Sequence, residues 1–203
     1  PVELVDNDGS SRGERHFIIF NPPVLNPALG LRKSSILEAV RLANNLLTHD
    51  VQSVVFARTR RSVEILLTHL QSHIVNLKSK IENPIRGYRS GYLPTQRREI
   101  EQGLRDGSVK TVVATNALEL GIDIGGLGAA LIVGYPGTIA STRQQAGRAG
   151  RGELPAVSIL VASPNPLDQF LQHAAHQSRR HPRLEGHGIP MEALDPSRLV
   201  LAS

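Results

Sequence analysis

Short apolar runs recur along the chain, and polar or glycine-containing turns separate them. Runs of four or five residues that do not alternate between apolar and polar positions are typical of strands buried on both faces of a parallel sheet. Six such strands are predicted, at residues 17–20, 53–57, 85–88, 111–114, 130–133 and 157–161. Apolar positions at helical spacing predict helices over residues 36–48, 63–74, 95–104 and 168–175, and one more near residue 145. The pattern therefore predicts an α/β fold with a mostly parallel central sheet of about six strands and right-handed crossovers.

Two helix starts carry hydroxyl residues that are suited to capping. Ser35 and Glu38 have the spacing of a capping box, so the first helix is expected to open there. Thr59 or Ser62 is expected to cap the second helix.

Residues 27–33 are expected to form a loop. Within it, Gly30–Ser34 (GLRKS) superficially resembles a phosphate-binding P-loop. That motif requires glycine directly before the lysine and again five positions earlier, where this chain has Arg32 and Pro27. We therefore reject a P-loop at this position.

Polar segments directly follow several of the predicted strands, at residues 58–61, 89–91 and 115–123 and after Val133. In open α/β sheets, ligands bind outside the C-terminal ends of the strands. We expect these segments to gather at one edge of the sheet, together with an arginine-containing stretch further along the chain.

That stretch is Gln144–Arg151 (QQAGRAGR). If it is helical, Arg148 and Arg151 are three positions apart and face the same target. Gly147 and Gly150 have no side chains, so a bulky group could approach the backbone there. A guanidinium group matches the geometry of phosphate oxygens. The stretch therefore predicts a phosphate clamp, in which Gln145 is expected to face solvent.

Composition narrows the possible partners. The net charge of +5 favours a polyanion, and an aromatic content of 3% without tryptophan argues against base-stacking platforms. The absence of cysteine excludes disulfides and thiolate chemistry within this chain. No membrane-length apolar run or signal-peptide layout is present, so we expect a cytoplasmic protein without a membrane partner.

Taken together, these motifs resemble those of superfamily-two helicases. Residues 113–124 (VATNALELGIDI) resemble motif V, and Gln144–Arg151 resembles motif VI. Residues 56–59 (FART) resemble motif IV, and residues 89–93 (RSGYL) resemble the adjacent nucleic-acid-contacting loop, although Arg89 stands where many relatives have histidine. The chain is most similar to MrfA-like bacterial DNA helicases, which are related to RecQ-type enzymes. The resemblance implies the second of two RecA-like domains, with three layers.

The resemblance also implies roles in ATP hydrolysis. Arg148 and Arg151 would act as arginine fingers, and Gln144 would couple the nucleotide to the opposing domain. Asp123 is expected at the nucleotide edge, together with Gly121 and Gly147. No Walker A motif or Asp-Glu pair occurs in the chain. The family pattern therefore implies that ATP with Mg²⁺ is held mainly by an absent first domain, and we expect no tightly bound cofactor here.

Backbone contacts to single-stranded DNA are implied for a second set of residues. They are Thr115, Asn116, Arg58, Thr59, Arg60, Ser90 and Gly91. Hydroxyl, N–H and cationic groups of this kind bind phosphates without reading bases, so sequence-independent contact with DNA is expected.

Residues 17–175 are therefore predicted to form the helicase C-terminal domain. Residues 1–16 are expected to be a linker from the first RecA-like domain, and residues 176–203 a linker toward a C-terminal accessory region. The implied function is the C-terminal motor half of an ATP-dependent DNA helicase or translocase in DNA repair, with no ATPase activity when isolated. Two alternatives stay open: a degenerate RecA-like module that binds nucleic acid or protein without ATP turnover, and an unrelated α/β enzyme.

Overall fold

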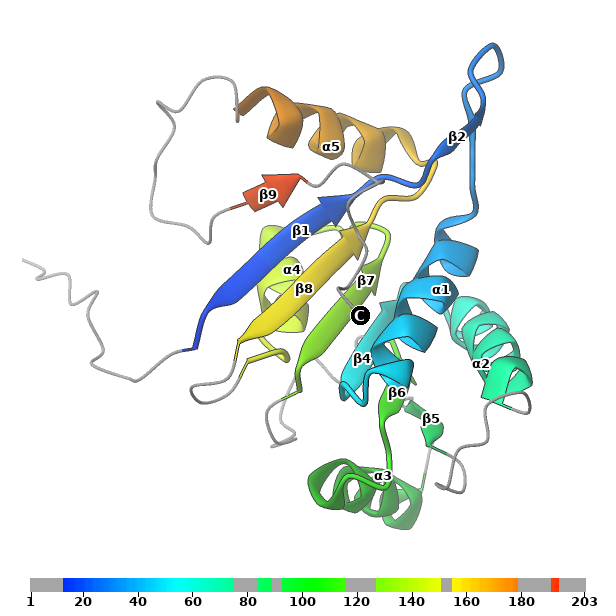
Figure 1. Ribbon diagram of the computed structural model, residues 1–203, viewed down its shortest axis with the longest axis vertical. Coiled ribbons are helices and arrows are strands. Elements are labelled where there is room, and N and C mark those ends of the chain that lie inside the picture. The colour runs from blue at the N-terminus through cyan, green and yellow to red at the C-terminus, as the bar shows by residue number, and fades with distance from the viewer. Residues whose placement is uncertain are drawn as a thin grey trace, which may run out of the picture.

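The computed structural model describes residues 13–74, 84–88, 93–115, 127–150, 155–178 and 191–193. Its centre is a seven-stranded sheet in which every pairing is parallel. In spatial order the strands are β5 (Ile85–Tyr88), β6 (Thr111–Ala114), β4 (Ser53–Ala57), β7 (Ala129–Val133), β8 (Ala156–Val161), β1 (Arg15–Phe20) and β9 (Met191–Ala193). Because the sheet is parallel, one edge carries all the strand starts and the other carries all the strand ends (Figure 1).

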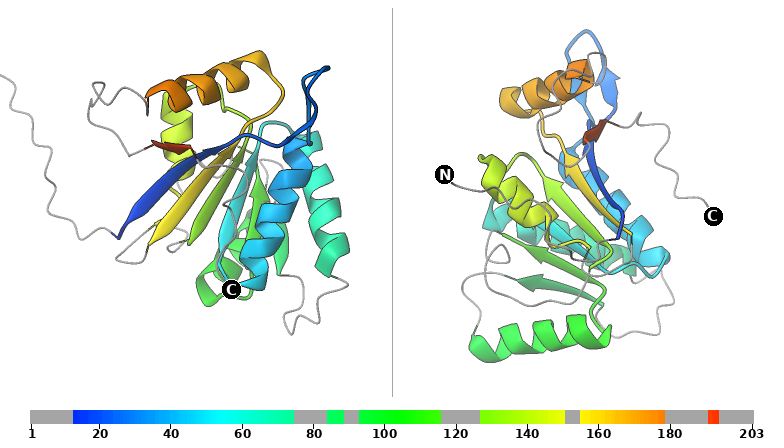
Figure 2. Two further views of the ribbon diagram at one scale, coloured as in Figure 1. Left: turned by 45° about the horizontal axis from the view of Figure 1, so that its top comes forward. Right: turned by 90° about the vertical axis from the view of Figure 1, so that its left-hand side faces the viewer.

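Helices cover both faces of the sheet and complete three layers (Figures 1 and 2). The helices are α1 (Ser35–Thr48), α2 (Arg60–Ile74), α3 (Pro94–Asp106), α4 (Ile139–Ala146) and α5 (Pro166–Ser178). Residues of α1 and α2 pack into one apolar cluster, and residues of α3, α4 and α5 pack into another on the opposite face. Alternate residues of β4, β6 and β7 enter the two clusters, which explains why these strands do not alternate between apolar and polar positions.

All six strands predicted from the apolar runs are present. β4, β5 and β6 match the predicted bounds, β7 and β8 each start one residue earlier, and β1 starts at Arg15. The α/β class and the parallel sheet are thereby confirmed. The seventh strand, β9, pairs with β1 and lies within residues 176–203, where we expected a linker.

The segment expected to be a loop at residues 27–33 contains part of a β-hairpin. β2 (Val24–Asn26) pairs antiparallel with β3 (Leu31–Arg32) across a turn that ends at Gly30. Gly30 has a φ of +62°, a left-handed conformation that glycine adopts without strain. The hairpin projects beyond the strand ends of the sheet (Figure 1).

The capping box predicted at Ser35 and Glu38 is wrong. Ser34 is the N-cap of α1, and its hydroxyl accepts a hydrogen bond from the N–H of Leu37 at 3.5 Å. The Glu38 side chain is buried instead, and it forms ion pairs with Arg41 at 2.9 Å and Lys33 at 3.7 Å. Two nearby cations compensate the buried carboxylate, so it is not available to cap the helix.

Candidate functional site

The chain turns sharply from strand to helix at the carboxyl end of β4. Arg58 and Thr59 connect Ala57 to α2, which begins at Arg60. The Thr59 hydroxyl accepts a hydrogen bond from the N–H of Ser62 at 3.0 Å, so Thr59 caps the helix and Ser62 does not. Residues 58–60 are all exposed. Two arginines, a hydroxyl and the N-terminus of α2 therefore meet at this edge, which is a suitable arrangement for binding an anion.

Thr115 belongs to the same edge. It directly follows β6, whose last residue Ala114 pairs with Phe56 of β4, so Thr115 lies one strand away from the Ala57–Arg58 turn. Neighbouring strands are about 4.8 Å apart. The structure thus brings Thr115 together with Arg58, Thr59 and Arg60 as predicted. Asn116 lies outside the described residues.

β5 lies on the far side of β6 and ends at Tyr88. The Tyr88 hydroxyl donates a hydrogen bond to Glu101 of α3 at 3.3 Å, and the Tyr88 side chain is buried. Burial raises the pKa of Tyr88 above its usual value, and the negative charge of Glu101 raises this pKa further. This contact fastens the end of β5 to α3. Ser90 and Gly91, which follow in sequence, lie outside the described residues.

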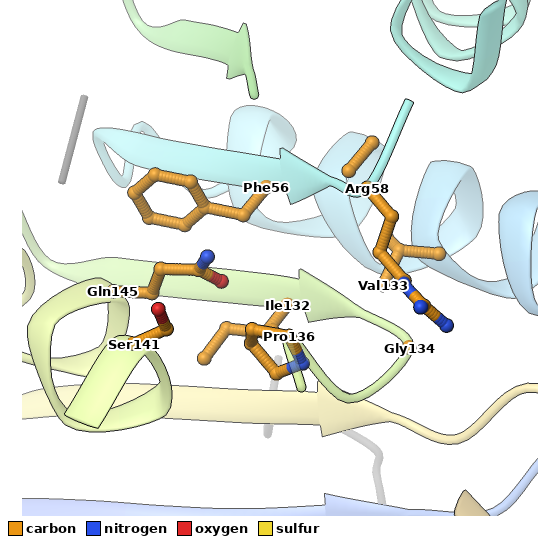
Figure 3. A pocket seen from close by; sticks show the side chains of 9 residues that line it. Phe56, Arg58, Ile132, Val133, Gly134, Pro136, Ser141 and Gln145 are labelled. Atoms are coloured by element: carbon orange, nitrogen blue, oxygen red, sulfur yellow. The ribbon is translucent and has the colours of Figure 1, made fainter. Parts of the chain in front are cut away.

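A pocket of about 280 Å³ opens beside the carboxyl ends of β4 and β7. Arg58 extends along one side, and Ser141 and Gln145 reach the pocket from α4 (Figure 3). Its lining residues are Phe56, Ala57, Arg58, Ile132, Val133, Gly134, Pro136, Ser141 and Gln145. Gln145 is 5% exposed, so the prediction that it faces solvent is wrong. It lies on the sheet-facing side of α4, a position that could be recognised only once the helix was placed.

The buried carboxylate of Asp168 fixes the loop after β7. From the sequence, Asp168 was predicted only to begin a helix. Asp168 of α5 is 3% exposed and accepts hydrogen bonds from the N–H of Ser163 at 2.8 Å and from the N–H of Tyr135 at 3.3 Å. Gly134, with a φ of +77°, lies between Asp168 and Arg58, and a Cβ there would be 3.4 Å from Asp168 Oδ2 and 3.5 Å from Arg58 Cδ. Asp168 therefore connects the ends of β7 and β8 next to the pocket.

We expect Asp168→Ala to lower the free energy of unfolding by about 2–3 kcal/mol, because two partly buried N–H groups lose a charged acceptor. Urea denaturation of the purified chain measures the change. Asp168→Asn is the matched control, since its amide oxygen retains one acceptor and should lose less stability. Equal stability of wild type and Asp168→Ala would contradict the structural role of this carboxylate.

The arginine-containing stretch begins in α4, but the helix ends before the first arginine. α4 ends at Ala146, and Gly147 is its C-cap. Arg148 follows within the turn, and Ala149 forms a parallel β-bridge with Leu127. The prediction that Arg148 and Arg151 share a helix face is therefore wrong, because the helix stops before Arg148. Arg151 itself lies outside the described residues.

This turn lies at the opposite edge of the sheet from Arg58 and Thr115. α4 starts after the carboxyl end of β7 and carries the chain back across the sheet (Figure 2), so that Gly150 lies beside Ala156, where β8 begins. The expectation that all the candidate segments gather at one edge is therefore wrong for the turn that holds Arg148, whereas Gln145 of the same stretch reaches the pocket beside Arg58. Gly121 and Asp123, which are also candidates for the nucleotide edge, lie outside the described residues.

The candidate residues in the last turn of α4 and in the turn after it differ in exposure. Gln144 and Gly147 are exposed, and Arg148 is half-buried. A Cβ on Gly147 would come within 3.0 Å of the Arg143 carbonyl. A Cβ on Gly150 would come within 2.9 Å of the Ala156 Cβ. The space that a Cβ would take at each glycine is therefore already occupied by the chain itself.

Nowhere in the described residues do three or more His, Cys, Asp or Glu side chains gather as metal ligands would. Over the same ranges, no helix is both long and apolar enough to cross a membrane.

A parallel sheet between two layers of helices, with candidate phosphate-binding groups at both edges, is the architecture of a RecA-like domain. Residues 34–153 match the model of the helicase conserved C-terminal domain, so the chain belongs to that family. It is 45% identical over 203 residues to the ATP-dependent helicase YprA of Bacillus subtilis (strain 168), covering 99% of this chain and 26% of YprA. It is 37% identical to the ATP-dependent helicase HRQ1 of Saccharomyces cerevisiae, covering 86% of this chain and 16% of HRQ1.

Solved structures agree with this assignment. The crystal structure of the DUF1998 helicase MrfA bound to DNA matches with a TM-score of 0.79 and 45% identity, covering 98% of this chain and 26% of MrfA. MrfA bound to DNA and AMPPNP matches with a TM-score of 0.77 and 44% identity over the same shares. The predicted resemblance to the second RecA-like domain of such helicases is confirmed. The chain spans about a quarter or less of these relatives.

Proposed function

We propose that this chain is the C-terminal motor half of an ATP-dependent DNA helicase or translocase. The observation that carries the proposal is that Arg58, Thr59 and Thr115 lie at one edge of the sheet and the turn with Arg148 lies at the other. Such a domain can contact a DNA strand at one edge and a nucleotide at the other. The solved complexes of MrfA with DNA, and with DNA and AMPPNP, support this reading because the chain is 44–45% identical to that protein.

The carboxyl edge is proposed to hold single-stranded DNA. Arg58 and Arg60 supply cations, and Thr59 and Thr115 supply hydroxyls, at the ends of two adjacent strands. Asn116, Ser90 and Gly91 are proposed to extend this contact. Groups of these types bind phosphate oxygens, which are the same at every step of the strand, so the contact would be sequence-independent and would weaken with salt.

The amino edge is proposed to face ATP that the first RecA-like domain of the same polypeptide presents. Arg148 and Arg151 would stabilise charge on the transferring phosphate, and Gln144 would hydrogen-bond across the domain boundary. Gly121, Asp123 and Gly147 are proposed to complete this edge. Guanidinium and amide groups suit the phosphate chain, whereas Mg²⁺ prefers oxygen ligands, which we assign to the first domain. When bound, ATP supplies the free energy for movement.

Movement would follow from alternating closure of the two domains. When both edges are occupied, Arg148 and Arg151 close the cleft on the nucleotide while the carboxyl edge grips the strand. Release of the phosphate contact lets this domain move along the DNA and grip the next phosphates. The parallel sheet is the rigid body between the two contacts, so a shift at one edge is transmitted to the other.

We expect Arg58→Gln, in the polypeptide that includes both RecA-like domains, to weaken single-strand binding about three- to tenfold. The slope of log K against log [salt] should become shallower by about 0.7, because one fewer counterion is released from a single strand. Binding isotherms on oligo(dT) and on a mixed sequence, each at several salt concentrations, measure both effects. Both sequences should lose affinity equally.

The matched control is Arg98→Gln, an exposed arginine on α3, which should retain wild-type affinity and salt slope. An Arg58→Gln enzyme with unchanged affinity and slope would exclude Arg58 from the strand contact. A loss confined to one of the two sequences would indicate base reading instead.

A further inference from the structure

An arginine at the amino end of β1 contacts the backbone of the turn at residues 147–150, which follows α4 and contains Arg148. Arg15 is the first residue of β1, and its Nη2 donates a hydrogen bond to the carbonyl oxygen of Gly150, 135 positions away in sequence. Gly150 lies between Arg148 and Arg151, the two proposed finger residues. No motif from the sequence comparison includes Arg15, because it precedes the apolar run by which β1 was recognised.

Gly150 lies close to the exposed side chain of Arg15. Gly150 has a φ of +81°, and a Cβ built on it would lie 3.1 Å from Arg15 Nε and 3.5 Å from Arg15 Cγ. The same Cβ would lie 2.9 Å from the Cβ of Ala156, so any residue larger than glycine would collide there. Glycine is therefore required both for the backbone conformation and for the approach of the Arg15 side chain.

Leu127 also holds the turn at Gly150. The N–H of Gly150 donates to the carbonyl of Leu127 at 2.9 Å, and Ala149 bridges the same residue. These contacts fix the peptide unit between Ala149 and Gly150 through its N–H group. Arg15 holds the carbonyl oxygen of the next peptide unit, which links Gly150 to Arg151.

The geometry points to Arg15 as a positioning residue for the arginine fingers; this inference rests on the function proposed above. By holding the Gly150 carbonyl, the guanidinium limits the rotation of the peptides after Arg148. Transition-state stabilisation depends steeply on such geometry, since a displacement of about 1 Å can cost about 100-fold in rate. Arg15 would act through Arg148 and Arg151 without touching ATP.

The surroundings of Arg15 make its replacement informative. The strand pairing beside it uses backbone atoms, with the N–H of Ala156 donating to the carbonyl of Glu14 at 2.9 Å. Removing the side chain therefore leaves the sheet intact. The next residue is His16, whose Nε2 lies 3.2 Å from Glu14 Oε1, and its replacement is a control on the same strand.

The test measures DNA-stimulated ATP hydrolysis in the polypeptide that joins this chain to the ATP-holding domain. We expect Arg15→Ala to lower kcat about 10- to 100-fold. The KM for ATP, the Kd for DNA and the thermal midpoint should stay close to wild type. Arg15→Lys, whose ammonium can still donate to the Gly150 carbonyl, should recover most of the loss. His16→Ala should behave as wild type.

Coupling to the fingers is tested by combining variants. Arg15→Ala should cause no further loss when Arg148 and Arg151 are already alanine, because the group that it positions is gone. A wild-type kcat for Arg15→Ala would overturn the inference. So would a loss that lysine does not restore and that accompanies a lowered thermal midpoint, since that pattern indicates a purely structural residue. Full turnover in the Arg148→Ala, Arg151→Ala double variant would instead refute the proposed function itself.

Discussion

Replacing Arg148 and Arg151 together with alanine is expected to abolish ATP turnover in the enzyme that contains this chain. An arginine that reaches the γ-phosphate stabilises charge that develops only in the transition state, so its loss lowers kcat without weakening ground-state binding. Contributions of this kind are roughly 10³–10⁵ in rate. We therefore expect kcat to fall at least about 1,000-fold. Steady-state ATPase assays and direct binding of a fluorescent ATP analogue separate the two quantities.

The single variants refine this prediction. Arg148→Lys keeps the charge but loses the planar fork, so its turnover should lie between those of wild type and Arg148→Ala. Arg143→Ala, an exposed residue on the last turn of α4, is the control for a general loss of positive charge and should leave kcat unchanged. If the double variant turned over ATP within tenfold of wild type, the arginine-finger role would be excluded.

The second large effect concerns the chain by itself. We expect no measurable ATPase activity from the isolated 203 residues, even with saturating single-stranded DNA, because the sequence has no Walker A motif to hold the phosphates. Joining the chain to the preceding RecA-like domain should produce DNA-stimulated hydrolysis. The measurement is phosphate release by the two polypeptides at equal concentration.

Two other outcomes have definite meanings. Hydrolysis that rises in proportion to the concentration of the isolated chain, and is lost with Arg148→Ala, would contradict the two-domain assignment. DNA binding without any hydrolysis, even when the two domains are joined, would favour the degenerate binding module over the motor. The joined polypeptide with Arg148 and Arg151 replaced by alanine is the negative control for both measurements.

The sequence predicted best those strands in which every position is buried. β4 (Ser53–Ala57) and β6 (Thr111–Ala114) are buried throughout, so an unbroken apolar run marks their bounds. The missed elements lack that signal. β2 and β9 are three residues long, and the exposed Val24 and Leu25 of β2 follow no period that a short window can detect.

The sequence predicted which types of residue form the candidate site, but not where all of them lie. Arg58, Thr59 and Thr115 were placed correctly because each directly follows a strand of a parallel sheet, and chain order alone determines which edge that is. Gln145 and Arg148 were misplaced for the opposite reason. Their positions depend on where α4 ends and on which face of α4 packs against the sheet, and local sequence does not specify either.

The sequence by itself determined the strands, the α/β class, the family motifs and the residue types available for phosphate binding, because these follow from local periodicity and side-chain chemistry. Tertiary structure decided that the turn holding Arg148 lies at the opposite edge of the sheet from Arg58 and Thr115. It also decided that Gln145 is buried, and that Arg15 reaches Gly150 across 135 positions of sequence. These are consequences of packing, since a helix that returns across the sheet reverses which edge its last residues occupy.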